Sequence, residues 1–431
     1  MVLIGLLAAA AVIVALPTAA GADRHAFRDV HNTKAFWSTA SLHRAAHAQL
    51  RPALQFRTAH VRSFALSGSA LRKVLVKAPQ YGTRAARTRP VIVSLPAPNG
   101  RFQRFALTKS QVMAPALARK HRDISTYYGR GIDDPSASIA ADISHIGFHA
   151  AIRSAHGGWY IDPYFRNDTS RYVSYSGADL AKSFPFVEHG VVKSDERVAK
   201  VSGLNALAPT GDVLRTYRLA LITDPGYAAY VGGPANVTAA KVALINRVTQ
   251  VYHDDLSIQL QLIGSTDLLN LNTWAQAIGP NGPCGAAACF TQAQATGCSS
   301  TTRARFVIGQ IIGASNYDIG HLALGQPGGG VANLGVVGRS NKAGGCTGIP
   351  TPVGDFYAID YVAHEMGHQF SGNHPFNGTQ LNCSSGNRNA ATSVEPGSGS
   401  SIMAYAGICL TDDLSPHSDP YFSQRSLQEI S

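Results

Sequence analysis

One short stretch constrains this chain more than any other: residues 364 to 374 read His-Glu-Met-Gly-His-Gln-Phe-Ser-Gly-Asn-His. His364 and His368 lie four apart, so on a helix both imidazoles project from one face and can bind the same ion. His374 can reach that ion only if the chain leaves the helix after His368 and turns back. Gly372 permits the bend, because a residue without a Cβ can adopt a positive φ. The pattern predicts a site for one metal ion.

Zinc bound by three protein ligands keeps a fourth position open, and there the ion lowers the pKa of water towards ~7. Glu365 stands beside the first histidine without binding the metal, so it is the candidate base. A helix that is rich in histidine by chance is the alternative, but five matched positions rarely arise in that way. We therefore expect one catalytic zinc ion, bound by His364, His368 and His374.

A second motif, Ser401-Ile402-Met403-Ala404-Tyr405, follows the third histidine closely. Together the two motifs resemble those of the metzincins, in which a turn carrying methionine lies beneath the metal, and Met403 matches that methionine. Residues 316–430 look most like the reprolysin (adamalysin) group, particularly its secreted bacterial members with a propeptide. The resemblance implies a zinc metalloendopeptidase that acts on proteins or peptides. It also implies an α/β (α+β) catalytic domain with a twisted mixed sheet, a zinc helix and a Met-turn, preceded by a β-rich prodomain.

The resemblance extends to the region before the zinc motif and has two departures. Residues 317–322 and 331–337 resemble the hairpin whose edge strand pairs with substrate, although an ordinary buried hairpin is the alternative. Pro375 stands where reprolysins usually carry Asp. Tyr405 has the spacing of a tyrosine that, in astacins and serralysins, approaches zinc as a fifth ligand or steadies the oxyanion. A tyrosine that packs in the pocket wall is the simpler interpretation.

The N-terminus indicates export. Residues 2–16 are uncharged and apolar, and Pro17 and the small residues Ala20-Gly21-Ala22 follow, so we interpret residues 1–22 as a signal peptide. An apolar run of this length falls short of the ~20 residues that a membrane span requires. We therefore expect a secreted, monomeric protein without a stable membrane anchor.

All six cysteines lie in the second half of the chain, and an even number in an exported protein predicts three disulfides. The connectivity cannot be deduced from the sequence. Cys383 and Cys409 bracket the segment between the zinc helix and the Met-turn, so they are the first pair to consider. A second zinc site is the rival interpretation.

The two parts of the chain differ in the sign of their net charge. Residues 23–207 contain 27 Lys and Arg against 12 Asp and Glu, whereas residues 208–431 contain 10 against 14. The two parts should attract each other, as an inhibitory propeptide and its enzyme would. Nucleic acid is a less suitable partner, because the positive residues are scattered. No cysteine lies in residues 23–207, so a thiolate cannot silence the metal, and Asp179 is a weak candidate for that role.

These boundaries define three parts: a signal peptide (1–22), a β-rich inhibitory propeptide (23–207) and a catalytic domain (208–431). Short β-rich runs separated by turns predict a β-sandwich-like shape for the propeptide. In the catalytic domain, hydrophobic periodicity predicts five elements and one disulfide-pinned loop. They are a strand at 216–222, a helix at 234–253, strands at 257–263 and 306–311, the loop at 280–302 and the zinc helix at 360–370.

Two functions of different kinds are compatible with these motifs. The first is a secreted zinc metalloendopeptidase made as a zymogen. The alternative is a secreted binding or adhesin-like protein that retains the metzincin fold but is held inactive by its front half. The intact Glu365 favours the enzyme, because a binding module has no use for a base at that position.

Overall fold

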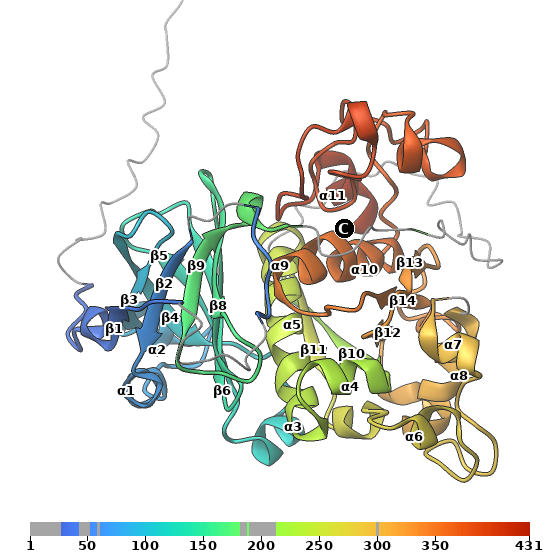
Figure 1. Cartoon of the computed structure of the whole chain (residues 1–431), viewed down its shortest axis with the longest axis horizontal. Coiled ribbons are helices and arrows are strands. Elements are labelled where there is room, and N and C mark those ends of the chain that lie inside the picture. Colours follow the sequence, from blue (N-terminus) through green and yellow to red (C-terminus); the bar gives the residue numbers. More distant parts are fainter. Residues whose placement is uncertain (1–26, 43–51, 58–60, 182–187, 189–212, 299–300) are drawn as a thin grey trace, which may run out of the picture.

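The structure is a computed structural model that describes residues 27–42, 52–57, 61–181, 188, 213–298 and 301–431. In these ranges the chain forms two β-sheets with a long helix between them (Figure 1). The predicted signal peptide and the predicted boundary at residue 207 lie outside the described residues. No helix among those that are described is long and apolar enough to cross a membrane.

We call residues 23–207 the front half of the chain and residues 208–431 the rear half. The described part of the front half contains one antiparallel sheet, the front sheet, with the strand order β1-β2-β9-β8-β7-β6-β5-β4-β3. Successive side chains of each strand point to opposite faces of the sheet. In β8, Trp159 and Ile161 pack into the front half's own core, whereas Tyr160 packs towards the rear half. The strands are β1 (Trp37–Thr39), β2 (Arg62–Leu66), β3 (Val91–Pro96), β4 (Phe102–Lys109), β5 (Ser125–Gly131), β6 (Ser138–Ser144), β7 (Gly147–Ser154), β8 (Gly157–Pro163) and β9 (Tyr172–Ser176). The predicted β-rich composition is confirmed, and the strands form one continuous sheet in place of the two sheets of a sandwich; its other face packs against helix α5 of the rear half.

The described residues of the front half include three short α-helices: α1 (Gly68–Leu75), α2 (Arg84–Thr88) and α3 (Pro115–Lys120). The apolar face of α1 carries Leu71, Val74 and Leu75, which close the front half's core. Helix α3 begins with a proline, which suits a first turn whose amide groups lack helical partners. Its Leu117 packs towards the rear half.

The rear half contains a sheet with the order β11-β10-β12-β14-β13 among its described strands, parallel except for β13. Its strands are β10 (Arg215–Thr223), β11 (Ile258–Leu262), β12 (Ile319–Leu324), β13 (Gly329–Ala332) and β14 (Gly345–Gly348). The two predicted strands at 216–222 and 257–263 correspond to β10 and β11. The predicted hairpin is wrong, because β14 lies between β12 and β13. The edge position of β13 agrees with the expectation for the substrate-binding strand.

The strand predicted at residues 306–311 is also wrong, because this segment lies within helix α8 (Thr301–Ile312). The buried residues Ala304, Ile308 and Ile312 recur every four positions, while Phe306 is 53% exposed. A helix separates these positions onto two faces, and a strand would not. The apolar run is therefore continuous only in sequence.

The remaining helices of the rear half are α4 (Pro225–Tyr230), α5 (Pro234–Leu256), α6 (Trp274–Ile278), α7 (Gln292–Thr296), α9 (Gly354–Phe356), the π-helical segment η6 (Tyr357–Ala363), α10 (His364–Gln369) and α11 (Gln424–Ile430). Helix α5 packs against β11 on one side and against β6 of the front half on the other. The segments α9, η6 and α10 follow one another without a break and form the zinc helix. One hydrophobic cluster joins this helix, α5 and the inner face of the front sheet.

Candidate metal centre

The structure brings the three predicted histidines together at the end of the zinc helix. His364 and His368 come from α10, and His374 follows the turn after it. The Nε2 atom of His368 lies 3.1 Å from that of His364 and 3.0 Å from that of His374. All three side chains are buried.

Each of these histidines is oriented by a backbone carbonyl that accepts a hydrogen bond from Nδ1. The acceptors are Ile402 for His364 at 2.7 Å, Gly372 for His368 at 2.6 Å and Asn387 for His374 at 2.6 Å. A carbonyl only accepts, so each Nδ1 carries the proton and each Nε2 presents a lone pair. Burial lowers the pKa of His368 to about 4, which keeps this imidazole neutral.

The turn that returns His374 differs from the expectation in one respect. Ser371 adopts the positive φ, 87°, and Gly372 does not. The Gly372 amide donates to the Gly367 carbonyl at 2.8 Å, and the Ser371 amide donates to that of His368. A Cβ on Gly372 would come within 3.1 Å of both the Gly367 carbonyl and Ile430. Glycine is favoured there by the close approach of the chain to the helix, and not by its φ.

Met403 lies beneath the zinc helix. It is fully buried, and a Cβ on Gly367 would fall 2.3 Å from its sulfur. The same turn supplies the Ile402 carbonyl that orients His364. The Met403 turn therefore both supports the helix from below and fixes one of its imidazoles.

Glu365 is completely buried, and neither of its carboxylate oxygens has a hydrogen-bond partner among the described residues. Burial raises its pKa well above the usual value, and the nearby Glu188 carboxylate adds to this effect. The edge strand β13 passes close by, since a Cβ on Gly330 would lie 2.0 Å from the Glu365 Oε1 atom. The backbone of the edge strand and this carboxylate are in direct contact.

The sequence did not single out Glu188, yet its carboxylate lies among the three histidines. Its oxygens are 3.2 Å from the His364 Nε2, 3.5 Å from that of His368 and 3.3 Å from that of His374. The Glu188 backbone forms a parallel bridge with Gly330 of β13.

The candidate chosen from the sequence for this role, Asp179, is not part of the cluster. It ends a short helical turn, Gly177–Asp179, and its carbonyl accepts from the Arg57 amide at 2.8 Å. The sequence shows only that Glu188 is an acidic residue in the segment that joins the two halves. Asp195 and Glu196 share that property, so the sequence could not choose between them.

Tyr405 lies within this cluster, two residues after Met403. Its hydroxyl donates a hydrogen bond to Glu188, and its ring centroid is 4.6 Å from that of His374 and 4.6 Å from that of Phe376. Burial raises the Tyr405 pKa well above its usual value, and Glu188 adds to the rise. The phenol therefore stays protonated and able to donate.

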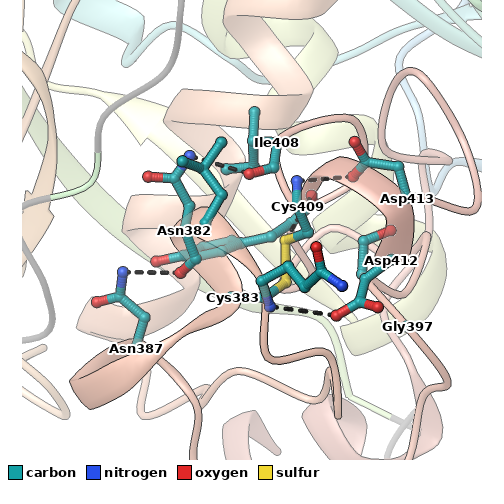
Figure 2. The surroundings of a disulfide bond; sticks show 12 residues. Asn382, Cys383, Asn387, Gly397, Ile408, Cys409, Asp412 and Asp413 are labelled. Carbon is teal, nitrogen blue, oxygen red and sulfur yellow. Dashed lines mark hydrogen bonds between the residues drawn. A yellow bond between two sulfur atoms is a disulfide. The ribbon is translucent and has the colours of Figure 1, made fainter.

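The three disulfides join Cys284 to Cys289, Cys298 to Cys346 and Cys383 to Cys409. The last is the pair favoured from the sequence, and Figure 2 shows its surroundings. Beside it, the Asn382 amide group donates to the Ile408 carbonyl at 3.0 Å, and the Asn387 amide group donates to the Asn382 carbonyl at 3.0 Å. Asn387 in turn orients His374. The disulfide thus anchors the loop that fixes the third histidine.

This donor set suits a metal ion. Glu188, His364, His368 and His374 offer ligand atoms that lie within 4.8 Å of one another. Two ligands of a tetrahedral zinc ion lie about 3.3 Å apart when both bonds are ~2.0–2.1 Å, close to the observed Nε2 separations. Lone pairs that converge without a donor between them repel one another unless a cation joins them.

The mixed sheet, the zinc helix and the methionine turn define a metzincin-like metallopeptidase domain. Residues 234–427 match the family described as Metallo-peptidase family M12B Reprolysin-like. This part of the chain resembles that family, and the chain is a metalloendopeptidase. No curated protein matches it. Among solved structures, it is similar to metalloproteinase-II from Bacteroides fragilis, with 13% identity over 84% of this chain and 94% of the other, and a TM-score of 0.43.

Proposed function

We propose that the protein is a secreted zinc metalloendopeptidase made as a zymogen, with His364, His368 and His374 as zinc ligands and Glu365 as the base. The observation that carries the proposal is the convergence of three buried Nε2 atoms, each fixed by a carbonyl on its Nδ1. A ligand set oriented in this way matches zinc better than the oxygen-binding hard cations.

Zinc supplies two effects when it is bound: it polarises the scissile carbonyl and acidifies water. The remaining chemistry belongs to Glu365. Its two unpartnered oxygens can accept the proton of the attacking water, and burial favours the protonated form that passes this proton to the leaving amine. Gly330 of β13 lies against the same carboxylate, so a peptide paired with this edge strand would bring its scissile bond to the base.

Latency follows from Glu188. In this arrangement its carboxylate takes the place at the three histidines that water and substrate require, and its backbone pairs with the edge strand β13 at Gly330. The Tyr405 hydroxyl donates to Glu188 here, and it is released to steady the oxyanion of a substrate once Glu188 leaves. Three disulfides support an oxidising compartment, in agreement with a signal peptide at residues 1–22.

The first test measures hydrolysis of casein and of a quenched peptide library by the processed protein, beside a Glu365→Ala variant, with and without a zinc chelator. We expect chelation to abolish hydrolysis, zinc to restore it, and the variant to lose at least a hundredfold in kcat while it still binds zinc. Equal activity in the variant would exclude Glu365 as the base. If the processed protein binds peptides but does not cleave them, the adhesin-like alternative is the better description.

The second test addresses latency in the uncut protein. Glu188→Gln removes the negative charge that faces the three histidines and keeps the size of the side chain. We expect the uncut variant to hydrolyse peptides at least tenfold faster than the uncut wild type, because a neutral amide is a poor zinc ligand. Asp179→Asn is the matched control and should leave the uncut protein silent. If both variants stay silent, Glu188 is not the inhibitory group.

A further inference from the structure

Helix α5 has no face directed to solvent in this structure. Every residue from Val237 to Tyr252 is buried, including Lys241, Arg247 and Gln250. Such a helix belongs to the interior of a fold and not to its surface. One side of α5 packs against β11 of the rear half's sheet, which we call the peptidase sheet, and the other side packs against β6 of the front sheet. If the front half left, a long side of α5 would become surface.

The front half also supplies partners for the charged groups on that side of α5. Arg247 pairs with Asp162 of β8, and the two side chains are 6% and 7% exposed. The Tyr175 hydroxyl donates to the other Asp162 oxygen at 2.5 Å, which completes the carboxylate's hydrogen bonding. If the front half left, Arg247 would keep its charge and lose its buried counter-ion. Within the closed interface each charge depends on the other, because either one left unpaired in this buried site would be costly.

A second polar group lies at the C-terminal end of α5. Asp254 accepts hydrogen bonds from Tyr128 and Ser138, and Arg153 pairs with it at 3.2 Å and with Asp255 at 2.8 Å. Tyr128, Ser138 and Arg153 all belong to the front sheet. The side chain of Asp254 is 8% exposed; burial would raise its pKa, but contacts with His253, Ser138, Tyr128 and Arg153 lower it to about 2.

The front half also covers the outer edge of the peptidase sheet. Strand β11 is the last strand of that sheet, and the front half pairs with it at Leu262. The Leu262 amide donates to the Val112 carbonyl at 2.7 Å, and the Ala114 amide donates to the Leu262 carbonyl at 2.8 Å. Uncovered edges invite pairing with other chains, and proteins usually protect them.

Inhibition uses a different part of the chain. The group that blocks the metal centre is Glu188, in the connecting segment (residues 182–212), whereas the contacts with α5 and β11 come from the β-sheet domain (residues 27–181). The two tasks are thus separable. We propose that the β-sheet domain stays bound to the peptidase after the connecting segment is cut, so that the mature enzyme is a two-chain complex with the β-sheet domain as a permanent subunit.

The test uses the full chain with an affinity tag at residue 23, a site-specific protease sequence between Leu207 and Ala208, and Glu365→Ala to prevent autolysis. After cutting, we expect both halves to elute together from the affinity resin and in one size-exclusion peak at micromolar concentration. They should also unfold in one thermal transition. A peptidase half that passes through the resin in folded form would overturn the proposal. Because the protein is inactive here, this result does not depend on the proposed catalysis.

A matched pair of variants locates the binding energy. Asp162→Ala removes the partner of Arg247 and should weaken association of the cut halves roughly a hundredfold. Asp133→Ala removes an exposed ion pair with Arg104 inside the β-sheet domain and should leave association unchanged. If Asp162→Ala fails to fold, the cut protein without further substitutions still decides the question by its behaviour on dilution. Equal association of both variants would contradict the proposed interface.

A consequence for activation rests on the proposed function. A cut after Leu207 leaves Glu188 attached to a domain that stays bound, at an effective concentration near the millimolar range. We therefore expect this single cut to leave catalytically intact protein below a tenth of full activity, and a second cut between Lys182 and Ser183 to release it. Full activity after the single cut, with the halves still associated, would show that Glu188 is not inhibitory and would leave the two-chain complex intact.

Discussion

Residue 330 must be glycine for the edge strand and the proposed base to come as close as they do. A methyl group there would lie 2.0 Å from Glu365 Oε1 and 2.8 Å from its carboxyl carbon, far inside any normal contact. Neither neighbour can move freely, because Glu365 is fully buried on α10 and Gly330 is paired with Thr347 of β14.

We expect Gly330→Ala to displace the Glu365 carboxylate and lower kcat at least tenfold, with zinc content unchanged because no histidine is touched. Steady-state kinetics with a quenched peptide, alongside metal analysis, checks this. Gly386→Ala is the control, since a Cβ there meets no atom within 4 Å. A Gly330→Ala enzyme with normal kcat would mean that the carboxylate is not held where the structure places it.

The sequence could predict those residues of the metal centre that lie close together along the chain. His364, His368 and His374 fall within one short motif whose spacing encodes its own geometry. Glu188 lies far away in sequence, and its approach depends on how the two halves dock, which no local pattern records. The positive φ at Ser371 was missed for a related reason, because the contact between Gly372 and Ile430 is also long-range.

At the scale of elements, the loop closed by Cys383 and Cys409 carries the carbonyl of Asn387, which orients His374. The disulfide spans 26 residues, so its loss should cost about 3 kcal/mol of stability in the chain-entropy view. The same loop carries the Ile402 carbonyl that orients His364, whereas Gly372, which orients His368, lies outside it. Loss of the disulfide should therefore disturb His374 and His364 before His368.

We predict that the double substitution Cys383→Ser, Cys409→Ser weakens zinc binding by ten- to a hundredfold, because the orienting hydrogen bond of a ligand is lost. Competition with a chromogenic chelator measures it. Cys284→Ser, Cys289→Ser opens a disulfide with a separation of only 5 residues, and none of the orienting bonds comes from it, so zinc affinity should not change. Equal loss in both variants would point to general destabilisation.

Among the elements, hydrophobic periodicity located β10, β11 and α5, whose apolar positions alternate or recur clearly. It failed for α8, whose apolar run is as continuous as that of a buried strand, so the period was hidden. It also missed β14, since Gly345 and Gly348 leave little signal in a strand of four residues. The zinc helix was predicted correctly, because its motif at residues 364–374 is long and specific.

For the whole molecule, the meeting of the two halves buries a carboxylate that cannot easily ionise. Asp355 of α9 is fully buried beside Tyr160 of the front sheet. Burial, with a smaller contribution from Asp360, raises its pKa to about 7 against the lowering influence of Tyr160, Arg247 and His417. An unfolded aspartate has a pKa of about 3.9. Between these two values the folded protein binds a proton that the unfolded chain does not.

Stability should therefore fall as pH rises from about 4 to about 7, by on the order of 4 kcal/mol at most, and level off above. Asp355→Asn stays neutral at every pH, so it should remove this slope and raise the melting temperature more at pH 7.5 than at pH 5. Thermal melts of the uncut protein at a series of pH values test it. Parallel curves for variant and wild type would contradict the raised pKa.

The order of strands in the front sheet bears on how the chain acquires its structure. From β3 to β9, each strand pairs with its neighbour in sequence, so these contacts close short loops and form early. The peptidase sheet instead pairs β10 with β12, about a hundred residues away. Because the N-terminal part is also synthesised first, the β-sheet domain can stand complete when α5 emerges. Helix α5 can then pack against a sheet that is already formed.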